Sequence, residues 1–391
     1  MSHLTGDTPI RVLVLGAGFG GLELSTRVAE ECGDRVEITL VDQSPGFVFG
    51  FSKLDVMFGK DSPEHVLHRY SDAVMPGVTF VNATVTSIDP VARTVETSEG
   101  TLEADILVVA LGCGVDPAAT PGLVEGGHEF YSNAGAFALR ETLEAFPGGR
   151  VVVGVTSTPF KCPPAPSETV MLVHEMLTER GLREGSEIAL VMPFSRPVPP
   201  SPEASATILG RLAELGIEWH PDHIVTGLDP DRRMVLMSDG EEMPYDLFLG
   251  IPKHVAPEVV VESGMTQDGW IPVDPHTMAT TYPNVYAVGD VTSAGTPKAG
   301  VFAEGQARVA ADHIIAAVKG STSDAQYDGA GICYLEFGDG TIAQVDIVFP
   351  PGQSPSGTLT GPDVALATDK TAFGADRVQR WFGRSWQPCE I

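Results

Sequence analysis

The stretch RVLVLGAGFGG, residues 11–21, joins an apolar run to a turn rich in glycine. The run is aliphatic and contains β-branched valines, so it predicts a β-strand that is buried on both faces. The turn has glycines in the spacing G-x-G-x-x-G, and the helix-like segment LELSTRVAEEC follows it. A strand, a glycine turn and a helix in this order predict a site where bare backbone and a helix N-terminus bind the pyrophosphate of a dinucleotide.

The glycines of this turn have separate roles. Gly16 permits the tight turn, Gly18 lets a pyrophosphate approach the backbone, and Gly21 lets the helix pack closely on the strand. A second apolar run, VEITLVD, ends at Asp42, where a carboxylate can accept hydrogen bonds from ribose hydroxyls. The alternative is a glycine turn in another kind of α/β domain. We expect cofactor contacts from Gly16, Gly18, Phe19, Gly20, Gly21 and Asp42.

Size and composition restrict the class of protein further. The chain has 391 residues, 43% of them apolar, which is enough for two or three packed domains and excludes intrinsic disorder. It has no long uncharged apolar run, and its start, MSHLTGDTPI, is unlike a secretory signal, so we expect a cytoplasmic protein. With 24 basic and 52 acidic residues the net charge is −28, which disfavours nucleic acid as a partner. We predict no metal site.

Two further apolar runs end on small residues, namely DILVVALG at residues 105–112 and NVYAVGD at residues 284–290. With the first motif, they resemble the two-dinucleotide-binding-domain flavoproteins over most of the chain. The resemblance implies bound FAD, with Gly112, Gly289 and Asp290 among its contacts. It also implies that the strand FVNATV places backbone near Val85 against the adenine. Taken alone, Gly289-Asp290 has an ordinary strand-end turn as its alternative.

The second nucleotide motif of this family is missing. Most relatives bind NAD(P)H in a second Rossmann unit in the middle of the chain. Here RVVVGV, residues 150–155, leads into TSTPFKCPPAPSE, which puts side chains and prolines where a pyrophosphate needs bare backbone. Only Gly154 remains of a glycine turn, and the next strand-like run, EIALVM, is followed by no acid that could bind a ribose. We therefore predict that nicotinamide is not the electron donor.

These patterns predict an α/β protein with two Rossmann-like dinucleotide-binding domains, the second degenerate, plus a small C-terminal α+β region. We assign residues 1–115 and 251–320 to the FAD-binding domain and residues 116–250 to the degenerate NAD-like domain. Residues 321–391 form the C-terminal domain, which begins with a stretch of small polar residues typical of a linker.

The segment PFKCPPAPSE resembles the active-site loop of sulfide:quinone oxidoreductases and of the flavoprotein subunit of flavocytochrome c sulfide dehydrogenases. The resemblance implies that Cys162 pairs with Cys333 beside the flavin and that Glu168 accepts a proton. Such a disulfide is an electrophile for hydrosulfide. A helix starts near Ser167, and we expect its N-terminus to stabilise a thiolate at Cys162.

Each of these signals also has a purely structural interpretation. Single cysteines are usually inert packing, and we interpret Cys32 and Cys389 in that way. Cys113 follows the ALG turn, next to the expected FAD site, and for it we favour a structural role over a role at the cofactor. An acid in the first turn of a helix, such as Glu168, favours the helix dipole on its own account. Some relatives have a third active-site cysteine where this chain has Ser132, so the length of any sulfur chain stays open.

Two segments near the C-terminus bear on the electron acceptor. The resemblance implies that Lys298, Ala299 and Gly300 lie at the pyrimidine edge of the flavin beside the acceptor pocket, where a lysine can stabilise the anionic reduced ring. The alternative is a solvated loop lysine. The segment ADRVQRWFGRSWQ, residues 375–387, combines basic and aromatic residues as interfacial membrane segments do, which predicts peripheral contact with the inner face of a membrane. A dimer contact or a lid over the flavin are its alternatives, and the oligomeric state stays open.

The leading hypothesis is a FAD-dependent enzyme similar to sulfide:quinone oxidoreductases. Sulfide, or another small sulfur species, opens the Cys162–Cys333 bridge, and two electrons pass through FAD to a quinone. The alternatives are a flavoprotein sulfide dehydrogenase that donates to a cytochrome, an NADH:quinone reductase, and a non-catalytic FAD-binding scaffold.

Overall fold

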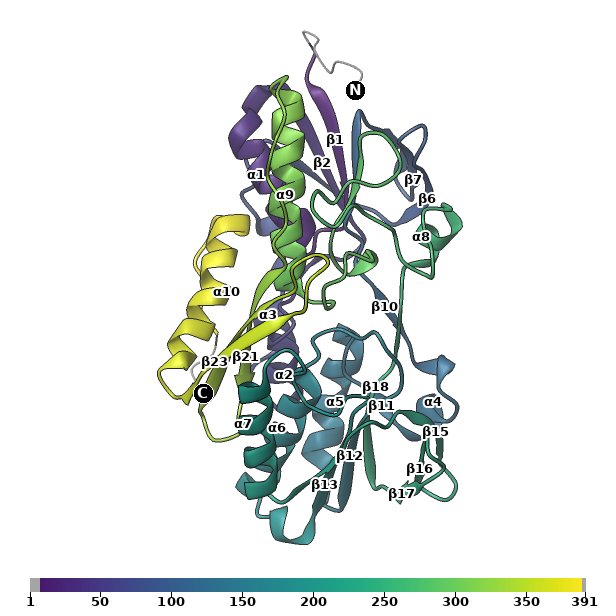
Figure 1. The fold of residues 1–391 in the computed structure, drawn as a ribbon, viewed down its shortest axis with the longest axis vertical. Coiled ribbons are helices and arrows are strands. Elements are labelled where there is room, and N and C mark those ends of the chain that lie inside the picture. The colour runs from purple at the N-terminus through teal and green to yellow at the C-terminus, as the bar shows by residue number, and fades with distance from the viewer. Residues whose placement is uncertain (1–7, 389–391) are drawn as a thin grey trace.

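A computed structural model describes residues 8–388 of the chain (Figure 1). The strand that precedes the glycine turn lies in the middle of a parallel sheet, paired with a parallel strand on either side. The strand order is β20 (Val285–Ala287), β9 (Ile106–Val109), β1 (Ile10–Leu15), β2 (Val36–Asp42) and β5 (Val78–Asn82). Parallel neighbours need crossover connections, and this arrangement brings the carboxyl ends of all five strands to one edge of the sheet.

Two long helices cover one face of this sheet. They are α1 (Phe19–Cys32) and α9 (Gly300–Val318), which pack against each other and lie side by side in Figure 1. A small antiparallel sheet and a short helix accompany the same unit, namely β6 (Val85–Asp89), β7 (Thr94–Thr97), β8 (Gly100–Glu103) and α8 (Glu258–Glu262). The predicted glycine turn therefore lies between β1 and α1, where a helix N-terminus meets the strand ends.

A second parallel sheet forms the lower unit in Figure 1. Its strand order is β11 (His128–Glu129), β18 (Leu247–Ile251), β12 (Arg150–Val155), β13 (Glu187–Val191) and β14 (Ile217–His220). Its helices are α5 (Asn133–Ala145), α6 (Ala165–Glu179) and α7 (Pro202–Glu214), and an antiparallel sheet accompanies it with β15 (Val225–Asp229), β16 (Met234–Met237) and β17 (Glu242–Pro244). Helix α6 begins three residues after Cys162.

The two units are joined by an antiparallel strand pair, β10 (Gly114–Asp116) and β19 (Lys253–Val255). The C-terminal region adds an antiparallel sheet and a helix, namely β21 (Ala330–Glu336), β22 (Ile342–Val348), β23 (Ser356–Asp363) and α10 (Leu366–Phe382). The remaining short elements are β3 (Gly46–Phe47), β4 (His68–Arg69), α2 (Ser52–Met57), α3 (Pro63–Val66) and α4 (Leu123–Gly126). Parallel sheets with covering helices and a small α+β end confirm the predicted fold class.

The aromatic side chains of the C-terminal segment lie in the core and not at the surface, and contact of this segment with a membrane stays a prediction. Trp381, Phe382 and Trp386 are only 1%, 0% and 9% exposed, because they pack into the core of the first unit. The indole of Trp381 donates a hydrogen bond to Oε2 of Glu23 on α1 at 2.9 Å, and Nε of Arg380 donates to the same oxygen at 2.7 Å. These rings cannot insert into a bilayer while they fill the protein core. Within residues 8–388, none of the helices has the length and apolar character needed to cross a membrane.

Candidate active site

The glycine turn after β1 has the geometry that a dinucleotide needs. Gly16 has φ +99°, a conformation that favours glycine. A Cβ on Gly21 would lie 1.8 Å from the carbonyl oxygen of Gly16, so the close approach of helix to strand requires glycine there. A Cβ on Gly18 would meet nothing within 4 Å, which leaves this backbone open to a ligand. Asp42 lies beside the turn and its Oδ2 accepts a hydrogen bond from the Ala17 N–H at 2.7 Å.

Two other strand ends lie at the same carboxyl edge of the sheet, and we call the surface between them and the glycine turn the flavin groove. Gly112 and Gly289 have φ values of +66° and +80°, and a Cβ on Gly112 would meet nothing within 4 Å. Asp290 follows β20, and among the described residues its carboxylate accepts only a long contact of 3.8 Å from Sγ of Cys113. Burial raises the pKa of Asp290, against the charges of Lys161 and Lys298, which lower it. A carboxylate that faces open backbone with spare acceptor capacity suits a ligand rich in hydroxyl groups, so this groove fits FAD.

Four other predicted contacts lie around this groove. Val85 begins β6, just beyond Ala83, whose N–H donates to the Asp42 carbonyl at 3.0 Å. Gly300 begins α9 directly beneath the ring of Phe19, because a Cβ on Gly300 would lie 2.4 Å from that ring. Gly20 packs against α9 and the strand end before Gly289. Phe19 therefore closes the turn on the side of α9.

Lys298 is a buried lysine and not the solvated one considered as its alternative. It is 6% exposed, and its Nζ donates to the backbone carbonyls of Asp290 and Thr292. The ammonium group lies 3.2 Å from the ring centroid of Trp270, a cation–π contact. Burial lowers the pKa of Lys298, while the neighbouring Cys113 and Asp290 raise it. The next residue, Ala299, is the N-cap of α9. Lys298 therefore lies between Asp290 and the N-terminus of α9.

The loop that carries Cys162 is hydrogen-bonded to the turn that carries Lys298. Lys161 and Lys298 form an isolated β-bridge, and the N–H of Cys162 donates to the Lys298 carbonyl at 2.8 Å. Cys162 has φ +47°, a backbone conformation that residues other than glycine rarely adopt. Its carbonyl accepts from the N–H of Ala165, the first residue of α6. The structure therefore holds the sulfur-bearing loop next to the groove that fits FAD.

Cys162 and Cys333 meet in the same region of the core. Both side chains pack against the apolar cluster of the second sheet, and each lies close enough to Glu168 for its charge to act on them. Cys333 comes from β21, far along the chain. Both are free thiols in this structure, so the disulfide stays a prediction.

The thiol pKa values bear on the sequence-based expectation of a thiolate. Burial raises the pKa of the Cys333 thiol to about 12, and burial also raises that of Cys162. Desolvation, and after it the charges of Cys333 and Glu168, oppose the Cys162 thiolate that the nearby start of α6 would favour, so activation of Cys162 by the helix stays a prediction. Burial therefore favours the neutral forms of both thiols over their thiolates.

Glu168 lies in the first turn of α6 and is 4% exposed. Its Oε1 accepts a hydrogen bond from the backbone N–H of Glu336 at 3.0 Å. Burial raises the pKa of Glu168 to about 7, and the nearby Lys370 works in the opposite direction. A carboxyl that titrates near neutrality beside two sulfur atoms can accept or release a proton at working pH.

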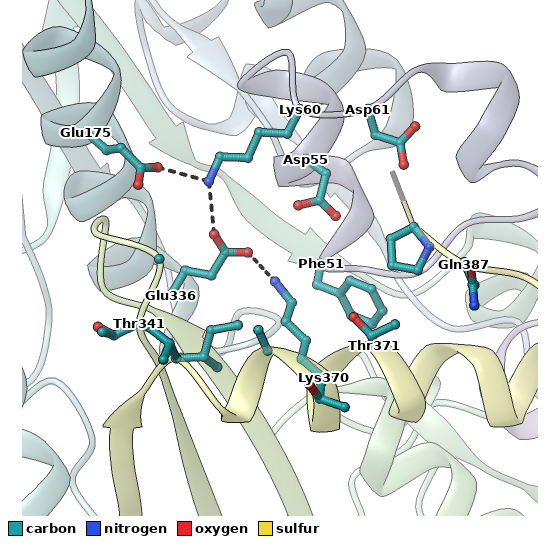
Figure 2. Close-up of a pocket in the computed structure, with 16 residues that line it drawn as sticks. Phe51, Asp55, Lys60, Asp61, Glu175, Glu336, Thr341, Lys370, Thr371 and Gln387 are labelled. Atoms are coloured by element: carbon teal, nitrogen blue, oxygen red, sulfur yellow. Dashed lines mark hydrogen bonds and ion pairs between the residues drawn. The ribbon is translucent and has the colours of Figure 1, made fainter. Parts of the chain in front are cut away.

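Glu336, whose N–H binds this carboxyl, lines a cavity of about 640 Å³ together with several other charged side chains (Figure 2). Nζ of Lys60 is 2.9 Å from Oε2 of Glu175 and 3.2 Å from Oε2 of Glu336, and Lys370 pairs with the other oxygen of Glu336. Burial raises the pKa of Asp55, which also lines the cavity, to about 6. Sequence reasoning missed this network because its members come from α2, the segment after it, α6, β21 and α10.

Two lysines close to the sulfur loop were missed as well. Nζ of Lys53, on α2, donates to the carbonyl of Tyr131 at 2.6 Å, and burial lowers its pKa to about 7. Nζ of Lys161 donates to the carbonyl of Cys113 at 3.4 Å, so Cys113 lies at the flavin groove and not in a remote core. Lys161 directly precedes Cys162 in the sequence and could have been singled out from that position, whereas Lys53 has no local signal.

The former nicotinamide turn is closed by side chains. A Cβ on Gly154 would lie 2.7 Å from a methyl group of Val225 and 2.9 Å from the ring of Phe248, so this glycine permits core packing. The backbone that follows is tied down too, because the N–H of Thr156 donates to the carbonyl of Ile251 at 3.0 Å. The glycine that remains from the motif is therefore no opening for a pyrophosphate.

Comparison with known protein families shows which family has this arrangement of nucleotide turn and second sheet. The family profile described as pyridine nucleotide-disulphide oxidoreductase matches residues 10–313. The chain belongs to this family. Pyridine nucleotide-disulphide oxidoreductases of this kind bind FAD, so the chain is a FAD-dependent oxidoreductase.

Similar proteins extend the comparison over most of the chain. Mitochondrial sulfide:quinone oxidoreductase of Mus musculus is 25% identical, over 85% of this chain and 77% of its own length. Sulfide-quinone reductase of Aquifex aeolicus is also 25% identical, over 87% of this chain and 84% of its own. The crystal structure of a sulfide:quinone oxidoreductase from Aquifex aeolicus superposes with a TM-score of 0.84 at 22% identity, covering 96% of this chain and 92% of that one. Among members of the family, this chain therefore shares its fold with a sulfide:quinone oxidoreductase nearly from end to end.

Proposed function

We propose that this flavoprotein is a sulfide:quinone oxidoreductase that uses Cys162 and Cys333 as a redox-active pair. The observation that carries the proposal is the convergence of these two cysteines with Glu168 beside the Lys298 turn of the FAD groove. Two relatives of similar length, from mouse and from Aquifex aeolicus, are named for this activity. The segment after β12 agrees with this proposal, because it has prolines and side chains where NADH would need a second glycine turn.

The sulfur chemistry follows from the two side chains. With the pair oxidised, hydrosulfide attacks one sulfur, the S–S bond between the cysteines breaks, and the other cysteine leaves as a thiolate. The attacked cysteine now carries a persulfide, Cys–S–SH, so atoms and charge balance. Bound FAD supplies the two-electron acceptor that connects this pair to the quinone. The chain itself supplies the enclosure, because both sulfurs are packed against an apolar cluster that limits access of water.

Glu168 is the proton acceptor in this proposal. A persulfide proton is acidic compared with a thiol, and a carboxylate beside the pair can remove it. The hydrogen bond from Glu336 fixes the carboxyl in place while one oxygen stays available. Burial that holds the pKa of Glu168 at about 7 matches it to this exchange near neutral pH.

Anaerobic mixing with sulfide tests the proposal. Sulfide should bleach the flavin absorbance of the wild-type protein, and Cys162→Ser and Cys333→Ser should each retain FAD but lose this bleaching. Cys32→Ser is the matched control, because Cys32 is buried at the end of α1 and takes no part in the proposed site. Bleaching of both active-site variants at the wild-type rate would refute the proposal.

The identity of the acceptor needs a separate measurement. Sulfide-dependent turnover should be fast with a soluble quinone such as decylubiquinone and slow with cytochrome c, and NADH should leave the flavin oxidised. Fast cytochrome reduction would favour the sulfide dehydrogenase alternative. Rapid bleaching by NADH would favour an NADH:quinone reductase, and no reaction with any donor would favour a scaffold.

A further inference from the structure

Three ionisable residues that line the cavity in Figure 2, namely Glu336, Lys370 and Asp55, act electrostatically on Glu168. The charge of Glu168 in turn acts on both Cys162 and Cys333. Its other neighbour is β21, where the N–H of Glu336 donates to Glu168 at 3.0 Å. The side chain of Glu336 lines the cavity and pairs with Lys370. One residue of β21 therefore contacts the catalytic carboxyl through its backbone and the cavity through its side chain.

The third of these cavity residues is Asp55 on α2. Asp55 lines the cavity, and among the described residues its carboxyl makes no hydrogen bond or ion pair, as Figure 2 illustrates. Lys370 is buried between the two carboxyls and acts electrostatically on both, because its charge favours the ionised forms of Glu168 and Asp55. The cavity reaches the protein surface, since it is also lined by Val364, which is 64% exposed.

The proposed reaction needs such a connection. Each turnover transfers one proton from the persulfide to Glu168, which becomes a neutral acid. Glu168 must lose that proton before it can act again, and its 4% exposure leaves no direct route to bulk water. A second carboxyl in a cavity large and polar enough for hydrogen-bonded water can take the proton onward.

We propose that Glu168, the Lys370–Glu336 pair and Asp55 form a proton route from the sulfur pair to the cavity. The route rests on the proposed function, because it resets the proton acceptor of that reaction. Glu168–COOH gives its proton through cavity water to the Asp55 carboxylate, and Asp55–COOH releases it to solvent. Glu336 and Lys370 stay ionised throughout and act as fixed charges that hold the two carriers.

The charges around the carriers are consistent with this division of roles. Burial raises the pKa values of Glu168 and Asp55 to about 7 and about 6, so the free-energy difference between a proton on one and a proton on the other is small near neutral pH. Burial acts against the charged form of Glu336, but Lys370 and Lys60 outweigh it and lower its pKa to about 2, so Glu336 is not a carrier. The other titratable groups that face the route are Cys162, Cys333, Tyr131, Asp61 and Glu175.

The variant Asp55→Asn distinguishes loss of the proton route from loss of the reaction with sulfide. Under anaerobic single-turnover conditions at pH 8, above the pKa of Glu168, sulfide should bleach the flavin of this variant at the wild-type rate, because Glu168 starts ionised. Steady-state turnover with decylubiquinone should fall at least about tenfold, since general acid–base groups contribute that much or more. Imidazole, a small diffusible base, should restore turnover in a saturable way, and Asp55→Glu should retain it. A purely structural role for Asp55 predicts no such rescue.

The matched control is Asp346→Asn. Asp346 is an exposed carboxylate on β22 whose charge also raises the pKa of Cys333, but it does not line the cavity, so its variant should turn over normally. Wild-type turnover in Asp55→Asn without imidazole, or slow turnover that imidazole leaves unchanged, overturns the route while the proposed function stands. Absence of bleaching in the wild-type enzyme overturns the proposed function and the route with it.

Discussion

Replacement of Glu168 by glutamine should make the protein more stable above neutral pH and inactive toward sulfide. Burial raises the pKa of Glu168 to about 7 from an ordinary value of 4.5. Between these pH values the folded protein holds a proton that the unfolded chain has lost, so stability falls as pH rises through the window. The difference between the two pKa values corresponds to about 3 kcal/mol of folding stability. This stability is fully present below pH 4.5 and is lost as the pH rises above the folded-state pKa of about 7.

The glutamine variant has no such loss because its side chain stays neutral. Its amide oxygen can still accept the hydrogen bond from Glu336, so the local structure is retained. The two proteins should therefore be equally stable near the lower pH, and the variant should be more stable by up to about 3 kcal/mol near pH 8. Sulfide-dependent bleaching should fall by about a hundredfold or more, since the proton acceptor is gone.

Unfolding of the holoenzyme, followed across this pH range by flavin fluorescence and denaturant titration, measures the effect. Glu179→Gln is the matched control, because Glu179 lies at the exposed end of the same helix and removes no buried charge. A stability difference between wild type and Glu168→Gln that stays constant from acid to alkaline pH would refute the reasoning on burial. An unchanged bleaching rate would refute the role of Glu168 as proton acceptor.

Three further predictions test other parts of the structure. Gly21→Ala should abolish FAD retention, because its Cβ would lie 1.8 Å from the Gly16 carbonyl oxygen; a flavin content equal to wild type would contradict this. Trp381→Ala should destabilise the protein by about 3–5 kcal/mol, measured by denaturant unfolding, since a fully packed indole is lost. Lys370→Gln should raise the pKa of Glu168, because Lys370 favours the ionised carboxylate. The infrared carbonyl band of protonated Glu168 should then remain visible to a higher pH than in the wild type, and its loss at a lower pH would contradict the assignment.

The local motifs could be predicted from the sequence because their function is carried by neighbouring residues. The turn from Gly16 to Gly21 needs a positive φ and a close backbone approach, and glycines in the sequence indicate both. The prediction that nicotinamide is not the donor rests on the same kind of reasoning, since side chains follow Gly154 where a second glycine turn would stand. The pairing of Cys162 with Cys333 was available only through a family resemblance, because no local pattern connects β21 to the loop before α6.

The rest depends on tertiary burial, which a single sequence does not reveal. Trp381 and its aromatic neighbours have the pattern of an interfacial helix, but the partner of that apolar face is the core around α1. The Cys162 pKa illustrates the same limit, because desolvation outweighs the helix N-terminus that the sequence shows. Asp55 and Lys370 lie 315 positions apart in the chain, and only the folded structure brings their charges to one carboxyl.

Mass spectrometry of the unreduced holoenzyme, alkylated before and after one equivalent of sulfide, tests the redox pair most directly. We predict that the peptides of Cys162 and Cys333 are joined before sulfide while Cys32 is alkylated. After sulfide, the link should open and one of the two peptides should carry one extra sulfur atom. Separate, singly alkylated peptides before sulfide, with no sulfur gained afterwards, would contradict the account.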